Sequence, residues 1–201
     1  MLTRRTILLA SAGATAFWAF PFVARAQAVR PTDATTFIEE FGNKLVRIVN
    51  EAVSADERSR QMRPLIDDAV AVDEIATFVL GRYARIATPD QRQRFVQLFH
   101  QVLILNVTSK MGEFRGVTYE MTQTVVRNNE AFVGTLITRP NQRPNNVQWV
   151  VSSASGRPQV VDVVAEGTSL RLTQRSDYAS FLTRNGNNLD ALITALQRQV
   201  S

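Results

Sequence analysis

Residue types that usually carry acid-base or metal chemistry are scarce in this chain. His100 is its one histidine, and the absence of cysteine excludes disulfides, thiol catalysis and thiolate metal sites. A histidine-centred acid-base or metal site needs a partner on the same face. His100 lies in an expected helix over residues 88–110, where none of its neighbours within one turn is an acid: Val96, Gln97, Leu103 and Ile104. We therefore interpret His100 as a structural or surface residue.

Two adjacent pairs of acids fall within predicted helices. Asp67 and Asp68 cannot share one substrate oxygen, because neighbouring helical side chains point in different directions. We interpret this pair as solvated charges on a helix surface. Asp73 and Glu74 precede an aliphatic stretch, and we interpret them as a helix cap.

Asp162 is the most unusual acid, because it interrupts the apolar strand formed by residues 160–164. Strand alternation places Asp162 and Val160 on one face, opposite Val161 and Val163. Two interpretations remain open: an ion pair with an arginine on the outer sheet face, or a buried catalytic acid. The ion pair is favoured because no acid-base partner accompanies Asp162.

Known catalytic motifs are also missing. The sequence has no phosphate-binding loop, no GxGxxG, no HExxH and no GxSxG motif. Residues able to line an apolar cavity are plentiful instead. An acyl chain gains about 0.8 kcal/mol per buried methylene, so an apolar cavity suffices to bind it. The residue types favour a non-catalytic binding protein, with no cofactor and no metal, over an enzyme.

The N-terminus has the layout of an export signal. Arg4 and Arg5 precede an apolar stretch over residues 7–23, and the small-residue triplet 24–26 follows. This order predicts a signal peptide over residues 1–26, cleaved after Ala26, with a membrane anchor as the alternative. Residues 3–8 resemble a twin-arginine export motif, which leaves that route or the ordinary one open. The predicted location is the periplasm.

Residues 27–201 then form a single domain. Cleavage removes three arginines and no acid, so the formal net charge falls from +5 to +2. A charge of +2 gives no argument for nucleic-acid binding, and no face combines aromatic with basic residues.

Apolar spacings of three and four predict helices over residues 33–53, 56–70 and 73–81. Pro64 is expected to bend or split the second of them. Thr88 and Gln91 form a capping box for the helix over residues 88–110. Residues 102–105 are apolar all round, so that end should be surrounded by protein or ligand.

From Gly116 the apolar period changes to two, which predicts strands. Asn128 and Asn129 predict a hairpin turn, residues 140–144 a loop and residues 155–157 a second turn. Four successive strands with short turns indicate an antiparallel meander. Helices over residues 170–183 and 188–200 close the chain. The fold class is therefore α+β, with helices packed on a curved four-stranded sheet.

Two segments resemble a known family. Residues 70–95 contain an acidic-aliphatic helix, a Gly-x-Tyr turn and a capped helix; residues 160–178 contain Asp-Val-x-x-Glu-Gly-x-Ser-Leu, then Arg-Ser and an aromatic residue. Both resemble the toluene-tolerance family of auxiliary components of ABC lipid transporters, which includes the phospholipid shuttles of the maintenance-of-lipid-asymmetry (Mla) system. Gly186 and the leucine stripe over residues 189–196 match the family's closing helix.

The resemblance implies a nuclear-transport-factor-2-like cup whose apolar cavity holds the tails of a phospholipid. It also implies docking to an outer-membrane complex and to an inner-membrane lipid-transport complex. Ala84 and Gln174 stand where the family usually has aromatic residues, which leaves a hopanoid or another apolar lipid as an alternative cargo. A non-catalytic periplasmic adaptor with a filled core is a further alternative.

Arg82 and Arg85 are candidates to meet a lipid phosphate, with a solvated surface role as the alternative. The cavity-lining residues expected from the resemblance are Phe78, Val79, Tyr83, Phe99, Leu103, Tyr119, Trp149, Val151, Val163 and Phe181.

Overall fold

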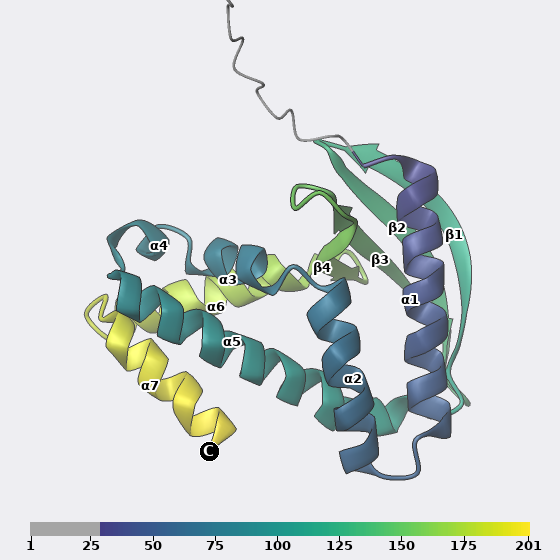
Figure 1. The fold of residues 1–201 in the computed structure, drawn as a ribbon, viewed down its shortest axis with the longest axis horizontal. Helices are drawn as coiled ribbons and strands as arrows, with labels where there is room; N and C mark the ends of the chain where they lie inside the picture. The colour runs from purple at the N-terminus through teal and green to yellow at the C-terminus, as the bar shows by residue number, and fades with distance from the viewer. Residues whose placement is uncertain (1–28) are drawn as a thin grey trace, which may run out of the picture.

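The computed structural model describes residues 29–201, in which two groups of helices flank an antiparallel sheet along the chain (Figure 1). The predicted signal peptide, residues 1–26, lies outside the described residues. The helices of the described part are α1 (Pro31–Glu51), α2 (Ala55–Ala69), α3 (Val72–Leu80), α4 (Tyr83–Ile86), α5 (Pro89–Lys110), the 3₁₀ turn η1 (Met111–Phe114), α6 (Leu170–Arg184) and α7 (Leu189–Val200). None of them is long and apolar enough to cross a membrane.

Several helix ends follow local sequence signals, but the start of α3 does not. Thr88 and Gln91 form the predicted capping box at the start of α5, and the Asn188 side chain caps α7. Asp73 does not cap α3: the N-cap is Ala71, so Asp73 and Glu74 lie in the first turn. In this position their negative charges still interact favourably with the positive N-terminal end of the helix dipole.

Pro64 does not split α2, which runs without a break from Ala55 to Ala69. A proline inside a helix removes one backbone hydrogen bond and costs about 3 kcal/mol. In α2 the side chains of Met62 and Ile66 are buried on either side of Pro64, and their packing offsets this loss.

The sheet has the order β1–β2–β3–β4–β5, with every neighbouring pair antiparallel. Its strands are β1 (Thr118–Arg127), β2 (Glu130–Thr138), β3 (Asn145–Ser152), β4 (Gln159–Ala165) and β5 (Thr168–Ser169). The predicted meander is therefore correct, but the two-residue strand β5 adds a fifth member. Asn128 and Asn129 make the predicted hairpin turn, with φ angles of 50° and 65°.

Two register shifts interrupt the ladders, one in β1 between Met121 and Thr124 and one at the β3–β4 pairing. In the second, Val151 pairs with Val160, whereas Trp149 pairs with Val163. An extra residue in β4 therefore brings Val160 and Val163 to the same face. The predicted assignment of Val160 to the opposite face is wrong, because a bulge breaks strict alternation.

Different helices contact different strands of the sheet. Helix α1 lies along β1 and β2 on one face (Figure 1). Helices α3 and α6 contact β4, and α5 and α7 pack on each other away from the sheet. The helix pair α1–α2 thus joins the sheet to the helical part of the molecule.

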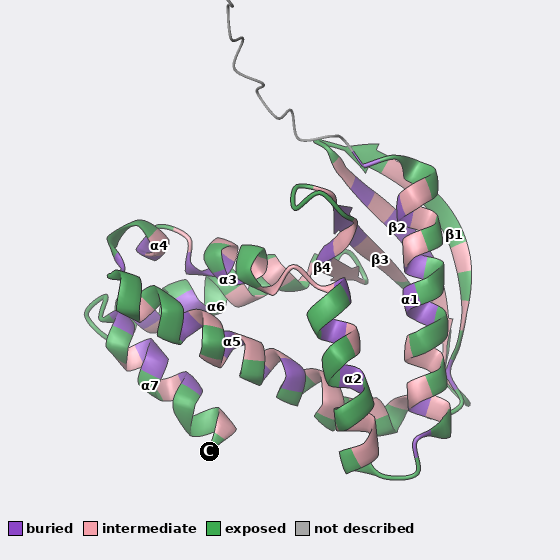
Figure 2. Cartoon of the chain, in the orientation of Figure 1, coloured by how far each residue is buried: buried purple, intermediate pink, exposed green. Residues whose placement is uncertain are grey.

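The buried apolar residues form three separate clusters. We call them the helical cluster (α3 to α7, around Phe95 and Leu182), the sheet cluster (α1 with β2 to β4, around Ile38 and Val133) and the α2 cluster (α1, α2 and α5, around Met62 and Val49). The last two meet at Val70, which packs against both. Figure 2 shows partly buried residues along α1, between these two clusters.

Candidate functional site

The α2 cluster is much less completely buried than the helical cluster. Its five buried residues, Val49, Met62, Ile66, Ile104 and Val117, are outnumbered by the partly buried apolar residues packed against them. These are Leu45, Val46, Ile48, Leu65, Val70, Leu103, Val107, Met111, Phe114 and Ile137. We call the α2 and sheet clusters together the apolar region. Each Å² of apolar surface that this region exposes to water costs about 25 cal/mol of free energy. An apolar ligand that covered this surface would remove that cost.

The sheet cluster supplies aromatic side chains to this region. Trp149 is partly buried; its indole Nε1 donates a hydrogen bond to Thr135 Oγ1 at 3.0 Å, and its ring stands edge-on to Phe41 with centroids 5.4 Å apart. Both contacts fix the orientation of the indole. The wall of the apolar region is therefore pre-formed on the sheet side.

Tyr119 ties the edge strand β1 to α1. Its hydroxyl donates to the Glu39 carbonyl oxygen at 2.9 Å and lies 3.0 Å from Asn43 Oδ1. Burial, with the charge of Glu39 in addition, raises the pKa of Tyr119 above its usual value. A Cβ at Gly42 would lie 2.8 Å from the Tyr119 ring, so only glycine permits this close approach of helix and strand.

The ten expected lining residues do not come together in one place. Leu103 lies in the α2 cluster, and Trp149, Val151 and Val163 lie in the sheet cluster. Tyr119 bonds to α1 as described. The other five belong to the helical cluster: Phe78, Val79, Tyr83, Phe99 and Phe181. The ten residues are divided among clusters because the apolar period of a helix does not reveal which of several cores the helix faces.

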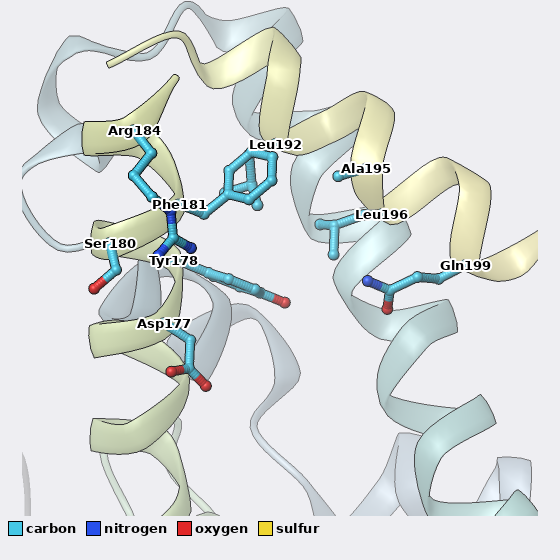
Figure 3. A pocket seen from close by; sticks show the side chains of 9 residues that line it. All are labelled: Asp177, Tyr178, Ser180, Phe181, Arg184, Leu192, Ala195, Leu196 and Gln199. Atoms are coloured by element: carbon cyan, nitrogen blue, oxygen red, sulfur yellow. The ribbon is translucent and has the colours of Figure 1, made fainter. Parts of the chain in front are cut away.

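The helical cluster carries a hollow of about 430 Å³ between α6 and α7 (Figure 3). Phe181 extends toward Leu192 there, and Tyr178 lies between the two helices. Burial, reinforced by the charge of Asp177, raises the pKa of Tyr178 to about 12. Phe181 is the only expected lining residue in this hollow, whose rim is polar, with Asp177, Ser180, Arg184 and Gln199.

Asp162 is a buried anchor for α6. Its carboxylate accepts hydrogen bonds from Ser169 Oγ and from the backbone N–H groups of Val163 and Arg171. The Arg171 Nε lies 3.5 Å from the carboxylate, and Arg171 also pairs with Glu130 at 3.0 Å. An arginine partner is therefore present as predicted, but it comes from helix α6 and not from the outer face of the sheet. These contacts occupy the carboxylate oxygens of Asp162.

His100 has an acidic partner that the sequence did not reveal. Its Nε2 lies 2.6 Å from Asp67 Oδ1, across the interface of α5 with α2. The pair borders a hollow of about 540 Å³ that Glu74 also lines, and the pKa of Glu74 is raised by burial and by Glu130, against the effect of Arg171. In residues 29–201 no group of three or more acids or histidines could hold a metal ion.

The interpretation of Asp67 and Asp68 as merely solvated charges is wrong in part. Both side chains are exposed, but Asp67 pairs with His100 and Asp68 pairs with Arg157 at 2.9 Å. These partners come from α5 and from the β3–β4 turn, so no sequence-local pattern could indicate them.

Comparison with known proteins supplies the family. A sequence profile of the MlaC protein family matches residues 29–198. The chain belongs to the MlaC family. The toluene tolerance protein Ttg2D of Pseudomonas putida is 28% identical over 149 residues, which span 73% of this chain and 67% of that relative. The family resemblance seen in the two sequence segments is thus confirmed.

A solved structure shows the same fold as this MlaC-family chain. It is a phospholipid-binding protein from Ralstonia solanacearum, in complex with a phospholipid. The two superpose with a TM-score of 0.73 over 84% of this chain and 97% of that chain, at 16% sequence identity. At this identity the likeness establishes the fold alone.

Helices α1 and α2 of this MlaC-family chain, with the residue that follows α2, contribute to the candidate site residues that were not predicted. Leu45, Leu65 and the C-cap residue Val70 are partly buried in the apolar region, yet none was among the expected lining residues. The helical spacing of apolar residues in α1 was visible, but it indicated only that the helix faces a core.

Proposed function

We propose that this protein is a periplasmic lipid carrier that binds a phospholipid with its acyl chains in the apolar region. The observation that carries the proposal is the accessible apolar surface between α1, α2, α5 and the sheet, where partly buried residues outnumber buried ones. In the helical cluster, by contrast, the buried residues outnumber the partly buried ones. A protein of the same fold was solved in complex with a phospholipid, which supports this choice of ligand.

The proposed wall combines two of the clusters. Leu103, Trp149, Val151 and Val163 contact the acyl chains in this proposal, together with the partly buried residues of α1 and α2. The remaining expected residues stabilise the helices that frame the region. The curved sheet and its helices then form the proposed nuclear-transport-factor-2-like cup.

The proposed role is transport without catalysis. The carrier is exported through its N-terminal signal and moves lipid between an outer-membrane and an inner-membrane complex. Transfer of an intact lipid breaks no covalent bond. The buried acid Asp162 is consistent with this role, since its contacts serve to hold α6 on β4.

Organic extraction of the purified mature protein is the direct test. The extract should contain stoichiometric phospholipid when it is analysed by mass spectrometry, because the apolar region remains accessible without a ligand. A hopanoid in place of phospholipid would support the role as a lipid carrier but would change the identity of the lipid that is carried. An extract without lipid, from protein that also takes up none from vesicles, would contradict the proposal and favour the adaptor.

A further inference from the structure

We propose that Arg58 binds the phosphate group of the lipid, at the end of the apolar region formed by the start of α2 and by η1. This inference rests on the proposed function, because it assigns the headgroup end of the same site. The ligand chemistry is a phosphate anion attached to an apolar tail.

The inward face of α2 carries Arg58 as well as apolar residues. Met62 follows Arg58 by one helical turn, and Leu65 and Ile66 follow by two. Met62 is fully buried and Ile66 nearly so, and all three apolar residues belong to the α2 cluster. Since residues three and four apart lie on the same helix face, Arg58 extends this face at its N-terminal end. A cation therefore adjoins the apolar region.

The guanidinium of Arg58 has an unsatisfied donor. Its Nε is buried and forms no hydrogen bond, the single buried side-chain atom of this kind among residues 29–201. A buried polar group without a partner is costly. The neighbouring acid Glu57 does not compensate, since it pairs with Arg60 and Gln61. Phosphate oxygens suit the guanidinium of Arg58, a partly exposed residue, because a guanidinium binds them through two parallel N–H groups.

The surroundings of Arg58 favour an anion with an apolar tail. The Arg58 Nη2 lies 3.3 Å from the position a Cβ would take on Gly112, so the side chain lies over η1. Phe114 of η1 is partly buried in the α2 cluster, and the Arg139 guanidinium stands 4.8 Å from its ring centroid. Two arginines thus flank η1 where the apolar region ends. The phosphate lies at this end in our proposal, and the tails extend toward Trp149.

Arg82, considered earlier for the same role, is engaged elsewhere. Its guanidinium donates to the Tyr83 hydroxyl at 2.9 Å and to Asn187 Oδ1 at 3.3 Å, and it stacks on the Tyr83 ring. It also lies on the helical part of the molecule, away from the α2 cluster. Arg58 is the better candidate on both counts.

Substitution of Arg58 by glutamine tests the assignment. Uptake from vesicles would be compared for a phospholipid and for diacylglycerol with the same acyl chains, which lacks the phosphate. We expect Arg58→Gln to weaken phospholipid binding about tenfold, as for loss of a charge-assisted hydrogen bond, and to leave diacylglycerol binding unchanged. Arg63→Gln is the matched control, because Arg63 is exposed on the same helix. Arg58→Lys should recover part of the affinity.

The outcomes separate the two proposals. Equal phospholipid binding by Arg58→Gln and the unsubstituted protein would overturn the phosphate assignment but leave the carrier intact. An equal loss for both lipids would also overturn it, by showing that Arg58 acts through packing. Displacement of bound lipid by inorganic phosphate would assign Arg58 to a free anion instead. Failure of the unsubstituted protein to take up either lipid would contradict the carrier itself.

Discussion

Bound phospholipid is expected to fall at least about tenfold when Leu103 is replaced by tryptophan. Leu103 is partly buried in the α2 cluster on the side of α5 that faces α2. An indole there would occupy space that the proposal gives to an acyl chain. Displacement of two methylenes alone costs about 1.6 kcal/mol, which is more than tenfold in affinity. Lipid content after purification, and uptake from vesicles, would measure the effect.

Leu98→Trp is the matched control for this substitution. Leu98 lies five residues earlier on α5 and is also partly buried, but it packs against the helical cluster. The Leu98→Trp variant should bind lipid as the unsubstituted protein does. The melting temperature of the Leu103→Trp variant should be no lower than that of the lipid-free unsubstituted protein, because the indole covers accessible apolar surface. Normal lipid content in Leu103→Trp would rule out the proposed position of the acyl chains.

Asp162→Ala is expected to lower the free energy of unfolding by about 3–5 kcal/mol, the usual effect of removing one partner from a buried ion pair. Asp162 is 6% exposed, and its removal leaves Ser169 Oγ and the Arg171 backbone N–H without their acceptor. For a domain of this size the melting temperature should fall on the order of 10 °C. Thermal and urea unfolding of the lipid-free protein would measure both quantities.

An exposed acid provides the comparison for Asp162. Asp68→Ala removes the partner of Arg157, but both side chains are at least half exposed, with 72% and 50% of their surface accessible. Such pairs contribute about 0–1 kcal/mol. If the two variants lost the same stability, the hydrogen bonds of Asp162 would not anchor α6.

Features that depend on a few neighbouring residues could be predicted from the sequence. The capping box at Thr88 and the Asn128–Asn129 turn are set by side-chain chemistry within four residues, and both are present as predicted. The antiparallel order of the sheet followed from the short turns between strands. These features need no knowledge of tertiary packing.

Features that depend on distant partners could not be predicted in this way. The bulge that turns Val160 to the face of Val163 is defined by the pairing of β4 with β3, and the partner of His100 comes from another helix. The division of the apolar residues among three clusters is likewise tertiary. For this reason five of the ten expected lining residues belong to the helical cluster and not to the apolar region, whereas Arg58 was not among the candidates.

The sheet order also affects self-association. A sheet that begins with β1 exposes the backbone of a ten-residue strand along one edge, and such edges can template aggregation between copies. The register shift between Met121 and Thr124 interrupts this edge, and the exposed charges of Glu120 and Arg127 flank it. At the opposite edge β5 is two residues long and leads directly into α6. Both edges therefore disfavour strand addition, and copies of the protein can remain separate even when concentrated.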